Sequence, residues 1–376
     1  MKHFITNYNI DCPEGAERAV LEDSIMHKGR LVTAGSKILG NFISPLDATV
    51  VTRLEAAGII ILGKTKMDEF GIAGLFADAQ KEPSGAVAAV AEGAADFALC
   101  NDYTGAIGQQ AAAGGLYYIH PTYGTVSRYG LIPAVPSMDQ IGIVCKTPDD
   151  GLRILSIIAG HDPKDGAMFR GRGAGAANPE LKEKLRIGVP HNIFDRAPGR
   201  ISPEAFIGIG LAGDFETVSI ELAYSDMNAQ VMQILCCAEI SGNISRYDGI
   251  KFGYRAEVFA DLQELYTKSR TEAFGQDAKL AAIMGAIVLS QDYYMRYYDK
   301  AMRIRRHIRD SLEFEKYDVI ILPSFDWAPE LLLAQGALPR LCGLPALTAP
   351  VGGGITLVAG ALREDVLFAA LEVLSV

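Results

Sequence analysis

The sequence has little of what marks membrane, secreted or metal-binding proteins. It contains one tryptophan and six histidines, and no apolar run approaches the roughly 20 residues of a membrane span. The first twelve residues carry scattered polar and charged side chains instead of the apolar core of a signal peptide. We therefore expect a cytoplasmic protein without a membrane segment.

Cysteine is scarce, and basic residues do not dominate. The cysteines form no CxxC pair, a spacing that suits neither a zinc site nor an easy disulfide, and we expect reduced, buried thiols. They are Cys12, Cys100, Cys145, Cys236, Cys237 and Cys342. A net charge of -10 and a pI near 5.2 argue against broad, direct nucleic-acid binding. No residue pattern indicates a metal or another cofactor.

What is present is a large apolar fraction with helix and strand signals in alternation. Apolar residues make up 49% of 376 residues, which indicates a globular protein with a sizeable core. Residues 48–57 have apolar positions at helical spacing, with Asp47 as the expected N-cap and Gly58 as the end. A continuous apolar run follows at 59–62 and is typical of a strand buried on both faces.

The same pattern recurs at 185–189 and 318–322, each run ending before a proline. Strands that alternate with helices predict an α/β fold whose sheet is covered by helices. We expect a helix ending near 152–160, a loop at 171–178 and a helical segment at 256–314. Because the strand signals bracket that helical segment, we expect one domain over residues 1–376.

Several segments resemble the amidase-signature family, and most closely its amidotransferase A subunits. In chain order they are 33–39, 47–51, 63–70, 121–131, 137–142, 159–163, 185–190, 245–249 and 293–301. The matches cover most of the chain in register. The resemblance implies an amidase-signature fold, a central mixed β-sheet with helices on both faces.

The resemblance also implies a mechanism. In the family a serine attacks a carboxamide, a second serine on a cis peptide relays its proton, and a lysine is the base. A hydroxyl is a weak nucleophile until a neighbouring group takes its proton. Backbone N–H groups of a glycine-rich loop would stabilise the oxyanion that forms.

Carried over to this sequence, all three catalytic positions differ. The segment that resembles Lys-Asp-Asn reads Glu-Asp-Ser at 22–24, which places Glu22 at the base position. The stretch that resembles Asp-Thr-Gly-Gly-Ser-Ile-Arg reads Asp-Tyr-Thr-Gly-Ala-Ile-Gly at 102–108, so Ala106 stands at the nucleophile. Counting back without a gap puts Glu82 at the relay serine. We therefore expect an inactive member of the family.

Other departures agree with this expectation. The loops between Phe70 and Glu82 and after Pro323 are shorter than in the family, and most of the N-terminal helices before Glu22 are missing. In the family an aspartate holds the substrate's ammonium. Its position falls near Leu333 in this sequence, where the side chain is apolar. These losses would remove walls of the substrate pocket as well as its chemistry.

Neighbouring groups offer a remodelled site. Glu22, Asp23, Glu82 and Asp102 would gather around the old active site, where carboxylates could bind a cation or share protons. We instead expect solvated carboxylates in a pocket opened by the shorter loops, because no ligand spacing accompanies them. Thr104 and Ser84 lie two positions from Ala106 and Glu82. A nucleophile displaced that far would miss a geometry that tolerates only about half an ångström.

Two further features suggest contacts with other molecules. The run 303–309 is basic on one side, with Met302, Ile304 and Ile308 apolar, and could touch RNA phosphate. We favour a solvated basic face with buried side-chain stems. Four tyrosines at helical spacing form a core or interface stripe, although the family places this helix along the active site. They are Tyr293, Tyr294, Tyr297 and Tyr298. His161 is expected in a turn and not as a ligand.

Three functional classes remain open. The first is a non-catalytic scaffold that binds B- or C-like amidotransferase subunits, another protein or a second copy of itself. The second is an enzyme: a glutamine amidase or amidotransferase subunit that supplies ammonia for tRNA-dependent amidation, or a carboxylate-based enzyme. The third is a protein with no retained role. We favour the first because three catalytic positions are changed together.

Overall fold

A computed structural model describes residues 2–76, 84–169, 184–194, 214–324 and 329–374. Its described strands form one mixed sheet of eleven, ordered β1-β3-β2-β4-β6-β5-β10-β11-β9-β7-β8. The strands are β1 (Phe4–Asn7), β2 (Arg18–Glu22), β3 (Ile60–Thr65), β4 (Phe97–Asn101), β5 (Tyr117–His120), β6 (Ile141–Cys145), β7 (Leu185–Pro190), β8 (Phe215–Ile220), β9 (Val319–Pro323), β10 (Ala346–Ala349) and β11 (Ile355–Ala359).

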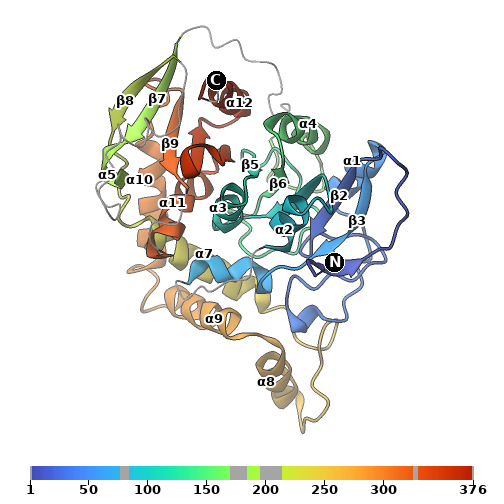
Figure 1. The fold of residues 1–376 in the computed structure, drawn as a ribbon. Helices are drawn as coiled ribbons and strands as arrows, with labels where there is room; N and C mark the ends of the chain where they lie inside the picture. Colours follow the sequence, from blue (N-terminus) through green and yellow to red (C-terminus); the bar gives the residue numbers. More distant parts are fainter. Residues whose placement is uncertain (1, 77–83, 170–183, 195–213, 325–328, 375–376) are drawn as a thin grey trace.

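Helices cover the sheet on both sides (Figure 1). They are α1 (Thr49–Ala56), α2 (Gly85–Ala91), α3 (Ala106–Ala113), α4 (Pro148–Ile158), α5 (His191–Phe194), α7 (Asn228–Ile244), α8 (Leu262–Ala273), α9 (Gln276–Leu289), α10 (Tyr298–Asp310), α11 (Pro329–Cys342) and α12 (Glu364–Leu374), with short 3₁₀ turns η1 (Lys37–Leu39), η2 (Glu69–Leu75) and η3 (Val351–Gly353). This is the expected α/β architecture.

Alternating side chains of the central strands feed separate cores. In β4, Phe97 and Leu99 join the core beneath α1, α4 and α12, whereas Ala98 and Cys100 join the core beneath α2 and α3. A strand places successive side chains on opposite faces, so a strand buried on both faces needs an uninterrupted apolar sequence. This explains the apolar runs that predicted β3, β7 and β9.

The predicted helix and strand boundaries hold with one correction. The helix expected at 48–57 is α1, and Gly58 follows it with a positive φ of 79°. Asp47, however, does not cap α1: Ala48 is the N-cap, and the Asp47 carboxylate accepts the backbone N–H of Lys28 at 2.7 Å. The carboxylate satisfies a loop amide instead of a helix amide, which the local sequence cannot distinguish.

The segment expected to be helical at 256–314 contains α8, α9 and α10. α8 and α9 lie beyond α7 at one end of the molecule, whereas α10 lies beside α11, near β9 (Figure 1). The loop expected at 171–178 lies outside the described residues. All six cysteines are free, and four of them are buried. Within the described ranges no helix has both the length and the apolarity to cross a membrane. The single domain over 1–376 stays a prediction.

Gly142 gives a test of the central sheet. It lies in β6 between β4 and β5, and a Cβ there would stand 2.6 Å from the Ile119 carbonyl oxygen. We expect Gly142→Ala to lower the free energy of unfolding by about 1–3 kcal/mol because the backbone must shift. Urea denaturation measures this loss. Gly166→Ala, with no atom within 4 Å of the added Cβ, is the matched control. Equal stability of the two variants would contradict the packing described.

Candidate functional site

A cavity of about 370 Å³ lies where three neighbouring parallel strands end. β2, β3 and β4 run in the same direction, so their carboxyl ends meet at one edge of the sheet, where α/β proteins commonly bind ligands. The lining includes Glu22 at the end of β2, and Asn101 and Asp102 at the end of β4. The other lining residues are Ile5, Gly35, Lys66, Met67, Asp68, Gly71, Ala73, Gly74, Ser84, Tyr103, Thr104, Ala106, Ile107 and Gln110.

Glu22 is buried in the wall of this cavity and is not solvated as the sequence suggested. Only 2% of the residue is exposed, and its Oε1 accepts the hydroxyl of Ser24 at 2.5 Å and the N–H of Asn101 at 3.4 Å. Burial, with a smaller contribution from the nearby charges of Asp68 and Asp102, raises the pKa of the Glu22 carboxyl to about 8. At neutral pH this carboxyl is therefore protonated. The last residue of a buried strand cannot reach solvent even beside shortened loops.

Asp23 does not line the cavity, because it follows Glu22 and points the other way. Its carboxylate accepts the N–H of Thr33 at 2.9 Å and lies 3.9 Å from the ammonium of Lys64. Lys64 also donates to the Glu22 carbonyl at 3.2 Å. Burial raises the pKa of Asp23 and lowers that of Lys64 to about 8. The pair is a structural support behind the cavity.

Asp102 organises the loop that leads into α3 and carries Ala106. Its carboxylate accepts the backbone N–H groups of Gly105 at 2.8 Å and Gly108 at 3.1 Å. It also pairs with Arg340 of α11 at 2.9 Å, and Arg340 donates from Nε to the Asp102 carbonyl. Both side chains are almost completely buried. A buried carboxylate needs such partners to offset its lost hydration.

Ala106 begins α3 on this loop and presents a methyl group to the cavity. Gly105 precedes it with a φ of 91°, and a Cβ there would stand 2.6 Å from the Cα of Gly336. The loop is thus pressed against α11 backbone to backbone. The Ala106 N–H points to the hydroxyl of Thr104 at 3.4 Å.

The remaining hydroxyl and amine groups of the cavity are separate from one another. Glu82 lies outside the described residues. Ser84 donates its backbone N–H to the Gln110 side chain at 2.6 Å. Among the described residues, no hydrogen bond joins Lys66 to Ser84 or Thr104. In the same ranges, no three His, Cys, Asp or Glu side chains gather closely enough to hold a metal ion.

Polar contacts fix the neighbouring loop between β5 and β6. Asp139 accepts the amide of Asn101 at 2.9 Å and the N–H groups of Ala134 and Val135, and burial raises its pKa to about 6. Asn101 in turn accepts the N–H of Gln140. The end of β4 is therefore tied to this loop as firmly as to α11.

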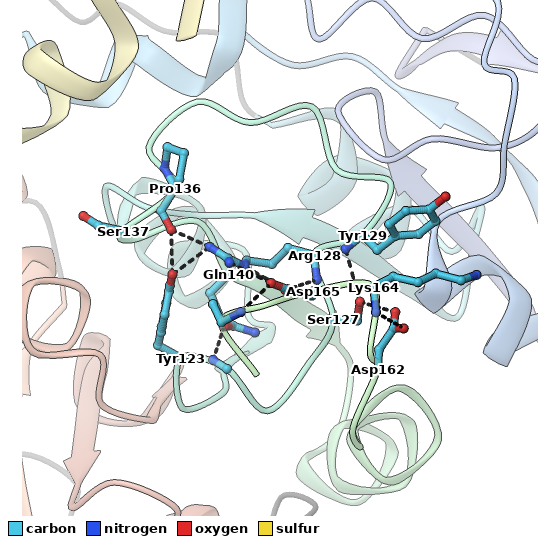
Figure 2. A network of polar contacts seen from close by, with 12 residues as sticks. Tyr123, Ser127, Arg128, Tyr129, Pro136, Ser137, Gln140, Asp162, Lys164 and Asp165 are labelled. Carbon is cyan, nitrogen blue, oxygen red and sulfur yellow. Dashed lines mark hydrogen bonds and ion pairs between the residues drawn. The ribbon is translucent and has the colours of Figure 1, made fainter. Parts of the chain in front are cut away.

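Figure 2 shows how the run at 121–131 is held. Arg128 pairs with Asp165 at 2.9 Å and donates to the Tyr123 hydroxyl at 2.8 Å. Asp162 accepts the hydroxyl of Ser127 at 2.7 Å and the N–H of Lys164 at 2.9 Å. The turn expected at 161–163 is present, and Asp162 anchors it.

Other expected site residues lie elsewhere. Leu333 is buried in the core around α7 and does not line the cavity. The four tyrosines also lie outside the lining, and Tyr293, Tyr294 and Tyr297 are exposed. They form neither a core stripe nor a wall of the cavity. Tyr298 begins α10, which packs against α7 and α11.

The basic run of α10 is only partly the solvated face expected. Arg305 is half-buried and donates to the Leu341 carbonyl at 2.6 Å and to the Ser137 hydroxyl at 2.9 Å. Met302, one of the apolar positions of this run, is exposed. Ile304 and Ile308 are buried as expected.

The sequence reasoning missed the roles of Arg340, Lys64 and Lys66. Arg340 carried a usable signal, because it is the one charged residue between positions 331 and 362. An isolated charge within an apolar run indicates a buried ion pair. Its partner, Asp102, lies 238 positions earlier and has no signal of its own in the sequence.

Comparison with known proteins gives consistent relatives. The chain matches the Amidase family over residues 19–76 and 83–341. It is 35% identical to the A subunit of glutamyl-tRNA(Gln) amidotransferase from Lachnoclostridium phytofermentans, over 91% of this chain and 76% of that protein. It is 36% identical to the corresponding A subunit from Nitratiruptor sp., over 94% of this chain and 88% of that protein.

A solved structure agrees with these relatives. The A subunit of glutamyl-tRNA(Gln) amidotransferase from Thermotoga maritima superposes with a TM-score of 0.74 at 25% identity, covering 98% of this chain and 85% of that one. A second structure, from a vestigial complex related to an s-triazine catabolic enzyme, has a TM-score of 0.73 at 20% identity. It covers 99% of this chain and 90% of that one and shows the shared fold.

Glu22 yields a prediction about pH. The unfolded chain ionises this carboxyl near its ordinary pKa of 4.5, whereas the folded chain keeps the proton up to about pH 8. The free energy of unfolding should therefore fall as pH rises from about 5 to about 8. One pKa unit corresponds to about 1.4 kcal/mol, so the fall should reach a few kcal/mol.

Glu22→Gln should flatten this fall, because an amide does not ionise. Urea unfolding of both proteins across this pH range measures the difference. Glu14→Gln, at an exposed turn, should retain the wild-type slope. Identical slopes for wild type and Glu22→Gln would show that the carboxyl is not buried as described.

Arg340 yields a prediction about stability. Arg340→Met leaves the Asp102 carboxylate buried without its counter-charge, and we expect a loss of about 3–5 kcal/mol in the free energy of unfolding. Adding Asp102→Asn should recover part of that loss. Arg363→Met, which removes an exposed pair with Asp365, should cost less than about 1 kcal/mol. Similar losses at both arginines would contradict a buried pair.

Proposed function

The chain belongs to the amidase family, and we propose that it is a non-catalytic relative of the amidotransferase A subunits that acts by binding protein partners. The observation that carries this proposal is the chemistry of the cavity wall. In the register of the family, a methyl group at Ala106 replaces the nucleophile, and a buried carboxyl at Glu22 replaces the base. The cavity itself is retained.

The Glu22 carboxyl is a poor substitute for a lysine base at neutral pH, because most of it is protonated there. A base must hold a free electron pair when the nucleophile releases its proton. With a pKa of about 8, the Glu22 carboxyl already carries a proton at pH 7. The methyl group of Ala106 has no lone pair with which to attack an amide carbon.

Three backbone donors of the loop are already engaged within it, which leaves the N–H of Ile107 as the donor of this first turn that has no hydrogen-bond partner among the described residues. Oxyanion stabilisation requires backbone N–H groups aimed at the reacting oxygen. Here the N–H groups of Gly105 and Gly108 donate to Asp102, and that of Ala106 is directed at Thr104. Asp102 in turn is held by Arg340. The two glycine donors therefore serve the ion pair that closes the loop.

A second candidate is an active glutamine-hydrolysing subunit that supplies ammonia, or an enzyme with new carboxylate-based chemistry. One observation favours it: the cavity still contains Lys66, Ser84 and Thr104, an amine and two hydroxyls. These groups would have to move into a connected chain before either hydroxyl could be activated. We therefore rank this candidate second.

The proposed partners are B- and C-type subunits, because the relatives are named as the A subunit of an amidotransferase. Such partners would place the protein in the cytoplasm. An overall charge of -10 supports contact with proteins over direct contact with RNA.

An activity and assembly experiment tests this proposal. The purified chain, alone and mixed with B- and C-type subunits of its own organism, is assayed for ammonia release from glutamine and simple amides. An active amidotransferase with its complete set of subunits is the positive control. We expect no release above the uncatalysed background, together with a stoichiometric complex by size-exclusion chromatography with light scattering.

Three variants test the alternative. Turnover that is lost in Ser84→Ala or Thr104→Ala would establish the enzyme and end the proposal. Turnover that both variants retain but Glu22→Gln abolishes would establish the carboxylate-based enzyme, whereas turnover that all three variants retain would indicate a contaminating amidase. Absence of any complex with these subunits would refute the proposed partners.

A further inference from the structure

The outer face of α9 carries large apolar side chains that nothing in the described chain covers. Leu280, Ile283 and Ile287 are exposed, Ile283 by 59%. The opposite face packs on α7 and uses smaller residues, namely Ala278, Ala281, Gly285 and Val288. A surface helix ordinarily buries its largest apolar residues and exposes polar ones. The reversed arrangement marks an interaction surface.

The exposed apolar residues continue past the end of α9. Every residue from 289 to 297 is exposed, and this turn contains Tyr293, Tyr294, Met295 and Tyr297. The rings of Tyr293 and Tyr297 lie 5.9 Å apart and pack on each other within this turn. α10 begins at the next residue, Tyr298. Tyrosine and methionine are enriched at protein interfaces. We call these residues, with Leu280, Ile283 and Ile287, the α9–α10 strip.

A basic groove adjoins the strip. A hollow of about 570 Å³ is lined by Met295, Arg296, Tyr297, Lys300, Arg303, Ile304 and His307. The groove lining contains three permanent cations and no acid. Of these cations only Arg303 has an acidic partner among the described residues, Asp299 one turn away. On a chain with a net charge of -10, this is a local reversal of charge.

The spacing of the apolar residues in the strip indicates what kind of partner segment would bind there. Leu280, Ile283 and Ile287 follow one another along α9 at intervals of three and four, as the a and d positions of a heptad do. Such a stripe packs against a second helix with the same period. The adjoining cations would then face acidic side chains along one edge of that helix.

We propose that the α9–α10 strip docks an amphipathic helix of a partner protein, with apolar residues at heptad spacing and carboxylates along one edge. A second copy of this chain suits the surface less well. A two-fold pairing through the strip would bring two basic grooves toward each other, where like charges repel. RNA suits it less well because the strip itself is apolar. The inference rests on the proposed function only in that the chain acts through protein partners.

A designed peptide tests the surface without knowledge of the natural partner. The probe is a labelled three-heptad synthetic helix with leucine at a and d and glutamate at its flanking positions. Its matched control has lysine at the flanking positions. Fluorescence anisotropy with the full chain should show binding of the acidic helix only. Binding should weaken as salt is raised, because exposed charges are screened.

Two variants of the chain separate the apolar and charged contributions. Ile283→Glu with Ile287→Glu, and Lys300→Glu with Arg303→Glu, should each weaken binding of the acidic helix by about tenfold or more. Val258→Glu, at an apolar side chain 75% exposed outside the strip, should leave binding unchanged. All these positions are exposed or line the open groove, and circular dichroism with thermal melting checks that the variants fold.

Several outcomes would overturn the inference. It fails if the acidic helix does not bind, if the Ile283 and Ile287 variant binds it equally well, or if the basic helix binds as tightly. A dimer in light scattering that Ile283→Glu disperses would assign the strip to a second copy. Competition by single-stranded RNA at the groove would assign it to nucleic acid.

The same variants separate this inference from the proposed function. If the B- and C-type subunits assemble with wild type and equally with the Ile283 and Ile287 variant, the docking surface is wrong and the proposed function stands. If the peptide binds as expected but these subunits never assemble with the chain, the proposed partners are wrong and the surface stands.

Discussion

A buried ion pair between Asp102 and Arg340 holds the centre of this molecule together. It joins the end of β4 to α11, two elements that are 238 positions apart in the chain. Asp102 also accepts the first amides of α3, so the pair fixes the helix that begins with Ala106. Because both groups are removed from water, neither can be lost without leaving an unpaired charge in the interior. The loop is consequently rigid, closed and occupied with its own hydrogen bonds.

This ion pair explains how the cavity keeps its shape whatever side chains line it. The carboxyl ends of β2, β3 and β4 still meet at one edge and still enclose about 370 Å³. In the proposed register, the wall of the cavity differs from that of the relatives in its charged groups. A carboxyl at Glu22 takes the place of an amine. Burial keeps most of that carboxyl protonated at neutral pH, so it adds a hydrogen-bonding acid to the wall. The side chains of the cavity wall can change without loss of the fold, because the fold depends on the strands and on the ion pair behind the site.

The surface around α9 and α10 has the opposite character. Large apolar side chains face outward, smaller ones face α7, and cations gather in the adjoining groove. No packing requirement inside the molecule accounts for Ile283 or Tyr294 in solvent. The proposed docking surface therefore lies on the exposed faces of α9 and α10 and not at the cavity.

The sequence by itself determined the class of fold, the family and several boundaries. The apolar runs that became β3, β7 and β9 were readable because a strand buried on both faces admits few polar residues, and Gly58 marked the end of α1 because a positive φ favours glycine. The assignment of Glu22 and Ala106 to the catalytic positions of the family also comes from the sequence register alone and stays a prediction. Tertiary structure decided the rest. Whether Glu22 is solvated or buried, whether Asp23 faces the cavity, and which charge Arg340 meets all depend on distant segments that pack together. Solvation and pairing are properties of three-dimensional neighbours, and a linear pattern carries them only where the neighbours are close in the chain.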